Sequence, residues 1–178
     1  MRLLMIFCAM VLIAALTACS GGGDKPTVAP NVEAPGDPLP AGLFVAQKPS
    51  GESPLAEAKK NAKAGDTIVL RGLVRGVTTA FIPNRAIVQL ADESVPKCPM
   101  NPERPWDLHC ETPESMAKNT ATVQIVGADG KPLKHGLQGV NGLEHMAQVV
   151  VKGTVVSSDG KGNLLITATE IFVEKKKG

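Results

Sequence analysis

Five strand-like stretches limit the possible folds of this sequence more than any other feature, and the first three of them alternate apolar and other side chains with a period of two. A period of two is typical of β-strands that bury one face. The predicted strands are residues 67–75, 85–91, 120–126, 148–156 and 164–173. Residues 157–162, between the last two, are mostly turn formers and predict a hairpin. The sequence therefore predicts an all-β domain accompanied by short helices.

Two of the predicted strands carry a glycine near the middle, Gly72 and Gly153. Glycine inside a strand usually marks a bulge or a bend, and a small barrel needs such bends to close. Five strands with a glycine-rich segment between the third and fourth, residues 134–145, resemble the OB-fold. The resemblance covers about residues 54–174. It implies a five-stranded OB-fold-like barrel with a long Cys- and Pro-rich insert between strands 2 and 3. A small β-sandwich, with a further strand at residues 43–45, is the alternative.

A short helix is expected just before the first strand. Ser53 is placed to cap it, Pro54 suits its first position, and Gly65 suits its end. The helix has a weak apolar face, which predicts that it lies against the barrel. This face consists of Leu55, Ala58 and Ala62.

Residues 1–18 have the pattern of a secretory signal. Arg2 precedes an apolar run of about 14 residues, shorter than the roughly 20 that span a bilayer, and small residues follow it. The sequence Leu16-Thr17-Ala18-Cys19 resembles the lipobox of bacterial lipoproteins. In that family the chain is cut before the cysteine, whose thiol receives a diacylglyceryl group. The resemblance implies lipidation of Cys19, and the alternative is an uncleaved membrane helix.

Residues 19–53 are rich in Gly, Pro and Ala, which predicts a tether between the lipid anchor and a domain at residues 54–174. Residues 175–178 form a basic tail. Cys19 is followed by Ser20 and not by the Asp that resembles an inner-membrane retention signal of such lipoproteins, so the resemblance implies the outer rather than the inner membrane. We therefore expect a lipid-anchored protein in the cell envelope, facing the periplasm. It resembles OB-fold envelope lipoproteins that carry a Cys-rich Pro-Trp-Asp loop.

Composition argues against two classes of function. The formal net charge is only +2, aromatic residues make up 3% of the chain and there is no Tyr, so oligonucleotide binding by analogy with the OB-fold is disfavoured. Arg71 and Arg75 would line the groove in that case. No phosphate loop, nucleophile elbow or cluster of acid, base and nucleophile is recognisable, so we expect neither an enzyme nor a cofactor.

The insert at residues 93–119 carries Cys98 and Cys110, for which three interpretations stay open. The first is a disulfide, as two cysteines in an exported domain usually form. The second is a metal site made by these cysteines and His109, with Asp107 or a distant His135 or His145, or with Met100 for copper. The third is a pair of free or redox-active thiols. Thr112 is predicted to cap a short helical turn that starts at Pro113.

Trp106 is either a buried plug of the insert or an exposed contact residue. His135 and His145 are expected to be ordinary surface residues, and Asp92, Glu93 and Asp107 to form a solvated face. The leading hypothesis is a monomeric, non-catalytic binding or scaffolding module for an envelope protein or glycan. Periplasmic metal handling through the insert is the second hypothesis. The candidate binding residues are Trp106, Asp107, His109, Arg71 and Arg75.

Overall fold

The computed structural model describes residues 36–159 and 162–175. The predicted signal, Cys19 and the first part of the predicted tether lie outside these residues. Within the described residues, no helix is long and apolar enough to cross a membrane.

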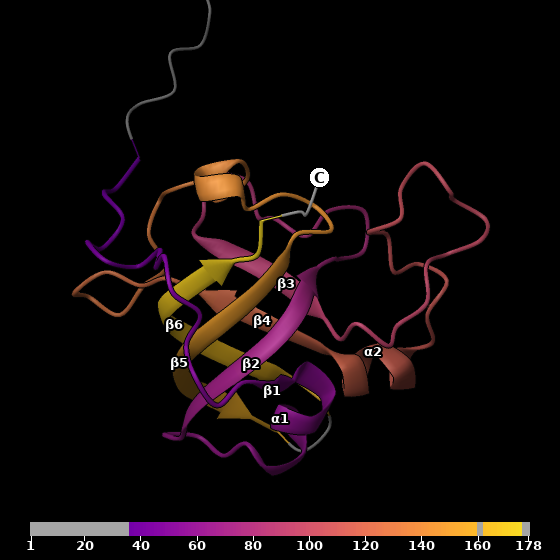
Figure 1. The fold of residues 1–178 in the computed structure, drawn as a ribbon, viewed down its shortest axis with the longest axis horizontal. Helices are drawn as coiled ribbons and strands as arrows, with labels where there is room; N and C mark the ends of the chain where they lie inside the picture. Colours follow the sequence, from indigo (N-terminus) through magenta and orange to yellow (C-terminus); the bar gives the residue numbers. More distant parts are fainter. Residues whose placement is uncertain (1–35, 160–161, 176–178) are drawn as a thin grey trace, which may run out of the picture. The chain divides into compact units, whose positions relative to one another are not determined.

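Five strands form a closed barrel (Figure 1). They follow the order β2–β3–β4–β6–β5, and β5 pairs again with β2. β4 and β6 are parallel, whereas the other neighbours in the barrel are antiparallel. The strands are β2 (Thr67–Val74), β3 (Ile87–Ala91), β4 (Thr120–Gln124), β5 (Gln148–Ser158) and β6 (Leu164–Val173). The expectation of an all-β, OB-fold-like barrel is therefore confirmed, and the strands lie close to their predicted positions.

The barrel interior is filled by the predicted apolar faces of the strands. Val88 and Leu90 of β3 and Val123 of β4 are almost fully buried. Most of the core is aliphatic, which agrees with the low aromatic content. Alternation places these side chains inside because successive residues of a strand point to opposite faces.

The two strand glycines lie where backbones approach closely. β5 and β6 shift register at Gly153, and a Cβ atom there would lie 2.4 Å from the backbone oxygen of Thr167. A Cβ at Gly72 would lie 2.9 Å from the oxygen of Ala91 on β3. β2 pairs with β5 along most of its length and reaches β3 only from Leu73 onward. The predicted irregularity is therefore a bulge at Gly153 and a close backbone contact at Gly72.

The short helix lies against the barrel as expected, but it begins and ends differently. Ser53 is not its cap, because Ser53 and Pro54 form β1 (Ser53–Pro54), a short parallel addition to β2. The helix α1 (Leu55–Asn61) ends before Gly65, and Leu55 is fully buried in the core. The carboxylate of Asp92, at the end of β3, accepts a 2.8 Å hydrogen bond from the N–H of Ala56. A distant residue thus satisfies the helix start that Ser53 was expected to cap.

Part of the predicted tether packs on the barrel. Leu43 is 2% exposed and belongs to the core. The N–H of Val45 donates to the oxygen of Ile171 at 3.0 Å, and the N–H of Ile171 donates to the oxygen of Leu43 at 2.7 Å. The packed domain therefore starts upstream of residue 54. This segment makes one isolated bridge rather than the extra strand of a β-sandwich.

Candidate functional site

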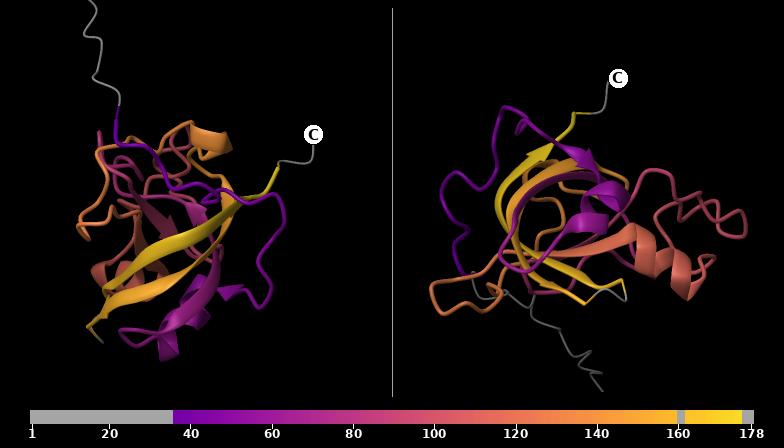
Figure 2. Two further views of the ribbon diagram at one scale, coloured as in Figure 1. Left: turned by 90° about the vertical axis from the view of Figure 1, so that its left-hand side faces the viewer. Right: turned by 90° about the horizontal axis from the view of Figure 1, so that it is seen from below.

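The insert leaves the barrel at Asp92 and returns through α2 (Pro113–Asn119), which leads directly into β4. It projects from the side of the barrel (Figures 1 and 2). Thr112 caps α2 as predicted, because its hydroxyl accepts from the N–H of Ser115 at 3.2 Å. The insert has a small apolar cluster of its own, which is separate from the barrel core. Val95 and Leu108 of the insert form it together with Ala91 at the end of β3, and Met116 packs against them.

Arg75 holds the first arm of the insert, which is the segment that leads from Asp92 to Cys98. The Arg75 side chain is 1% exposed, and its guanidinium donates to the oxygens of Val95 at 2.6 Å and Pro96 at 2.9 Å. Burial lowers the pKa of Arg75, and the charge of Glu111 opposes that shift. The expectation that Arg75 lines an open groove is wrong, because the insert covers that face of β2. Arg71 is paired with Glu93 at 2.8 Å.

The second arm of the insert, which carries Trp106 and Leu108 and leads to Cys110, is hydrogen-bonded to the turn that follows β2. The N–H of Gly76 donates to the oxygen of Trp106 at 3.1 Å, and the N–H of Leu108 donates to the oxygen of Gly76 at 3.3 Å. A Cβ at Gly76 would lie 2.3 Å from the oxygen of Thr79, so the turn has no space for a side chain here. Trp106, Asp107 and His109 are thus held against a fixed part of the barrel.

Asp107 is 5% exposed, so the expectation of a solvated carboxylate is wrong, as it is for Asp92 at 4%. The Asp107 carboxylate accepts from the N–H groups of His109 at 3.0 Å and Thr78 at 3.4 Å. It is also paired with Nδ1 of His109 at 3.3 Å and with Arg104 at 3.6 Å. Burial alone would raise the pKa of Asp107, but these hydrogen bonds outweigh it and the pKa is lowered. Asp107 therefore stays ionised and orients the side chains around it.

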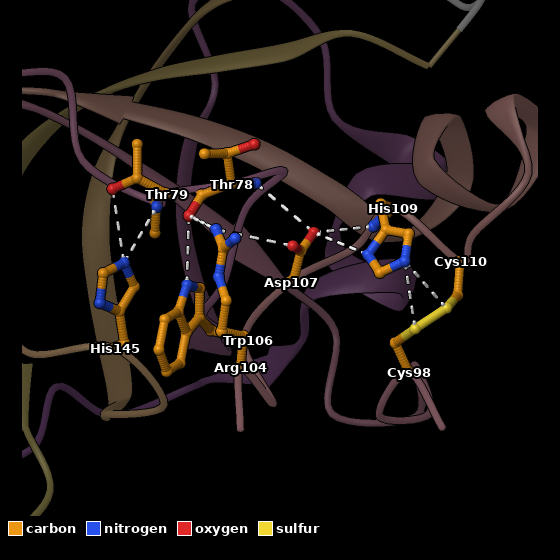
Figure 3. Close-up of polar contacts among 10 residues, drawn as sticks. Thr78, Thr79, Cys98, Arg104, Trp106, Asp107, His109, Cys110 and His145 are labelled. Atoms are coloured by element: carbon orange, nitrogen blue, oxygen red, sulfur yellow. Dashed lines mark hydrogen bonds and ion pairs between the residues drawn. A yellow bond between two sulfur atoms is a disulfide. The ribbon is translucent and has the colours of Figure 1, made fainter. Parts of the chain in front are cut away.

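Cys98 and Cys110 form a disulfide, with their Cα atoms 5.5 Å apart. Nε2 of His109 lies 3.6 Å from the sulfur of Cys98 and 3.7 Å from that of Cys110 (Figure 3). The disulfide interpretation is confirmed. His135 and His145 lie elsewhere: Nδ1 of His135 is 2.9 Å from the oxygen of Asp37, and His145 lies beside Trp106.

Trp106 is neither a buried plug nor fully exposed. Its ring is stacked on that of His145, with centroids 4.5 Å apart, and the Cζ atom of Arg104 lies 5.8 Å from its centroid (Figure 3). Its Nε1–H donates to the oxygen of Thr78 at 3.3 Å. We call Arg104, Trp106 and His145 the tryptophan platform. Sequence reasoning missed Arg104 and treated His145 as an ordinary surface residue, because no local pattern links these positions.

His145 connects the platform to the barrel. Its Nε2 accepts from the N–H of Ala80 at 3.3 Å, and its ring contacts the edge of Phe81 at 5.1 Å between centroids. Burial lowers the pKa of His145, while the charge of Glu144 opposes the shift. His145 also lines a groove of about 400 Å³ between the segment around η1 (Val140–Gly142) and the end of β6. The platform therefore borders a concave surface.

A larger groove of about 670 Å³ lies between α1, α2 and the β5–β6 hairpin. Lys59, Lys60 and Lys118 contribute to its lining. The ammonium of Lys59 donates to the backbone oxygens of Thr120 and Gly162. This lysine therefore joins elements that surround the groove.

No protein family and no curated protein matches the sequence.

Proposed function

We propose that this protein is a lipid-anchored envelope protein whose barrel is a non-catalytic binding module for another envelope protein. The observation that carries the proposal is the tryptophan platform, with its bordering groove, at the base of a disulfide-closed insert. Trp and Arg are enriched among the side chains that dominate binding energy at protein interfaces. Here both are present on one small, partly exposed surface.

The platform is preorganised for binding. Arg75 fixes one arm of the insert, Gly76 bonds the other, and the Cys98–Cys110 disulfide joins them. A partner that binds such a surface loses less free energy to ordering loops than one that binds a mobile loop. The rigidity of the insert thus supports a role in recognition.

A protein partner fits better than a glycan. Sugar rings bind Trp by stacking on an open ring face, whereas Trp106 is already stacked on His145 and is contacted by Arg104. Exposed apolar side chains in the adjoining segments offer further contacts of the kind that proteins use. Met100 in the insert is 76% exposed and Val77 in the neighbouring turn is 45% exposed.

The anchor is the second part of the proposal. The lipobox at residues 16–19 supports lipidation of Cys19, and a disulfide between Cys98 and Cys110 suits an oxidising compartment. The intact mass of the protein extracted from membranes should show a chain that begins at Cys19 and carries acyl groups. A full-length, unlipidated protein would contradict the anchor.

Photocrosslinking in cells tests the binding site. A photoreactive residue in place of Met100 should form a specific adduct with a protein, and Trp106→Ala or Arg104→Ala should reduce that adduct at least tenfold. The matched control is a photoreactive residue at Val156, which is also exposed but lies on β5. The same adducts from both positions, or an adduct that only a muramidase removes, would contradict a protein partner at the platform.

A further inference from the structure

Three metal-ligating atoms converge in the insert, on residues that lie outside the tryptophan platform. The sulfurs of Cys98 and Cys110 and a ring nitrogen of His109 all lie within 4.8 Å of one another. Cys98 is buried, Cys110 is half-buried and His109 is exposed. An ion could therefore reach the cluster from solvent.

His109 is oriented from its other ring nitrogen. Nδ1 lies 3.3 Å from the buried carboxylate of Asp107, while Nε2 is directed at the two sulfurs (Figure 3). The same carboxylate oxygen accepts from the backbone N–H of His109, which fixes the residue further. Metal-bound histidines almost always have such a carboxylate or carbonyl partner on the second nitrogen. The disulfide itself does not require this arrangement.

The two cysteines are held in place by contacts other than their own bond. The arm that carries Cys98 is bonded to Arg75 through Val95 and Pro96. The arm that carries Cys110 is bonded to Gly76 and is followed at once by the capped helix α2. These contacts do not involve the sulfurs, so they can keep the two arms near His109 when the disulfide opens. Two sulfurs that each lie about 2.3 Å from one tetrahedral Zn²⁺ ion are about 4 Å from one another. The two thiols therefore need to move apart only to about this distance.

From these contacts we propose that reduction of the Cys98–Cys110 disulfide converts the insert into a zinc site, with both sulfurs and Nε2 of His109 as ligands and Asp107 as a positioning residue. The reductant is a dithiol protein of the thiol–disulfide oxidoreductase class. Its two thiols become a disulfide, and their two electrons and two protons convert the disulfide of the insert into two thiols. Zn²⁺ then binds both sulfurs as thiolates, and two protons leave to solvent. Water completes the tetrahedral coordination.

The site exists only in the reduced protein, because disulfide sulfurs are not thiolates. The insert therefore has two covalent states, one closed by a disulfide and one closed by a metal ion. This inference does not depend on the proposed protein partner.

Zinc binding by the full chain, purified in detergent, tests the proposal. After reduction with a phosphine and removal of the reductant without oxygen, elemental analysis should find one zinc per chain, and the oxidised protein should hold none. Replacement of zinc by Co²⁺ should give a thiolate-to-cobalt charge-transfer absorption. Reduced protein without stoichiometric zinc, or oxidised protein with as much zinc as the reduced form, would overturn the proposal.

Variants separate the ligands from the positioning residue. Competition with a chromophoric chelator should show affinity for zinc lowered at least tenfold in His109→Ala, and ten- to a hundredfold in Asp107→Asn. His135→Ala, a matched change at a histidine outside the site, should leave the affinity unchanged. Wild-type affinity in His109→Ala would overturn the site, and wild-type affinity in Asp107→Asn would remove Asp107 from it. Circular dichroism of the apo proteins shows whether each variant keeps its barrel.

Discussion

The barrel and the insert are stabilised by different kinds of interaction. The barrel has a continuous aliphatic core, in which side chains such as Leu70 and Ile166 are fully buried. The insert has only a small apolar cluster and depends on a disulfide, a buried arginine and a buried carboxylate. Apolar burial is non-directional, whereas hydrogen bonds and disulfides fix geometry. The barrel therefore supplies most of the apolar stabilisation, whereas specific bonds fix the positions of the side chains in the insert.

Leu70→Ala in the barrel should have the largest effect on stability, and it tests whether the aliphatic core stabilises the whole domain. Loss of a fully buried leucine leaves a cavity, and we expect the free energy of unfolding to fall by about 2–5 kcal/mol. Urea denaturation, followed by circular dichroism for the barrel and Trp106 fluorescence for the insert, should show both signals shifting together. A loss below about 1 kcal/mol would contradict the importance of the core.

Removal of the disulfide should lower the local stability of the insert and leave that of the barrel unchanged. The Cys98→Ser/Cys110→Ser variant releases a closed loop with a sequence separation of 12, for which chain entropy predicts about 3 kcal/mol. We expect amide hydrogen exchange in the insert to accelerate on the order of a hundredfold, with β5 and β6 unchanged. Equal acceleration in the barrel would show that the two regions unfold as one unit.

Arg75→Met should have a smaller effect at the junction of the two regions. The variant keeps much of the side-chain volume but removes the hydrogen bonds to Val95 and Pro96, so we expect a loss of about 2 kcal/mol in unfolding free energy. Arg71→Met is the control, because it removes a half-exposed ion pair with Glu93 and should cost less than about 1 kcal/mol. Equal losses in the two variants would contradict the role assigned to Arg75.

The smallest expected effect is a dependence of the unfolding free energy on pH that arises from Lys59 of α1, which packs on the barrel. Burial lowers the pKa of Lys59 from 10.5 to about 8, while the charge of Asp159 opposes this shift. The folded protein therefore binds fewer protons than the unfolded chain between these pKa values, so stability should rise as pH increases from about 8 to 10.5. Because Lys59 is partly solvated, we expect a rise of less than about 1 kcal/mol. Thermal unfolding of Lys59→Met should lack this rise, and an unchanged rise would exclude Lys59 as its source.

The strands were predictable because their signal is local. The alternation that defines the inward faces of β3 and β4, and the glycine at the β5 bulge, can be identified from neighbouring residues alone. Thr112 was predictable for the same reason, since a cap and its helix are adjacent.

The platform and the supports of the insert were not predictable in this way. The alternation along β2 places Arg75 on the outer face of the barrel, where arginines are usually solvated. It is buried because the insert folds over it. Asp107 and His145 likewise depend on contacts with the turn that follows β2, far from them in sequence. Local patterns identified Cys98 and Cys110 as a pair, but not the carboxylate that orients the histidine beside them.

Asp92 links two parts of the molecule that are distant in sequence. Its carboxylate binds the start of α1 through Ala56 and the start of the insert through Ser94. The start of α1 and the start of the insert are therefore coupled through one carboxylate, by hydrogen bonds and not through the hydrocarbon interior. Because both attachments depend on the same carboxylate, one substitution at Asp92 would release the start of α1 and the start of the insert together.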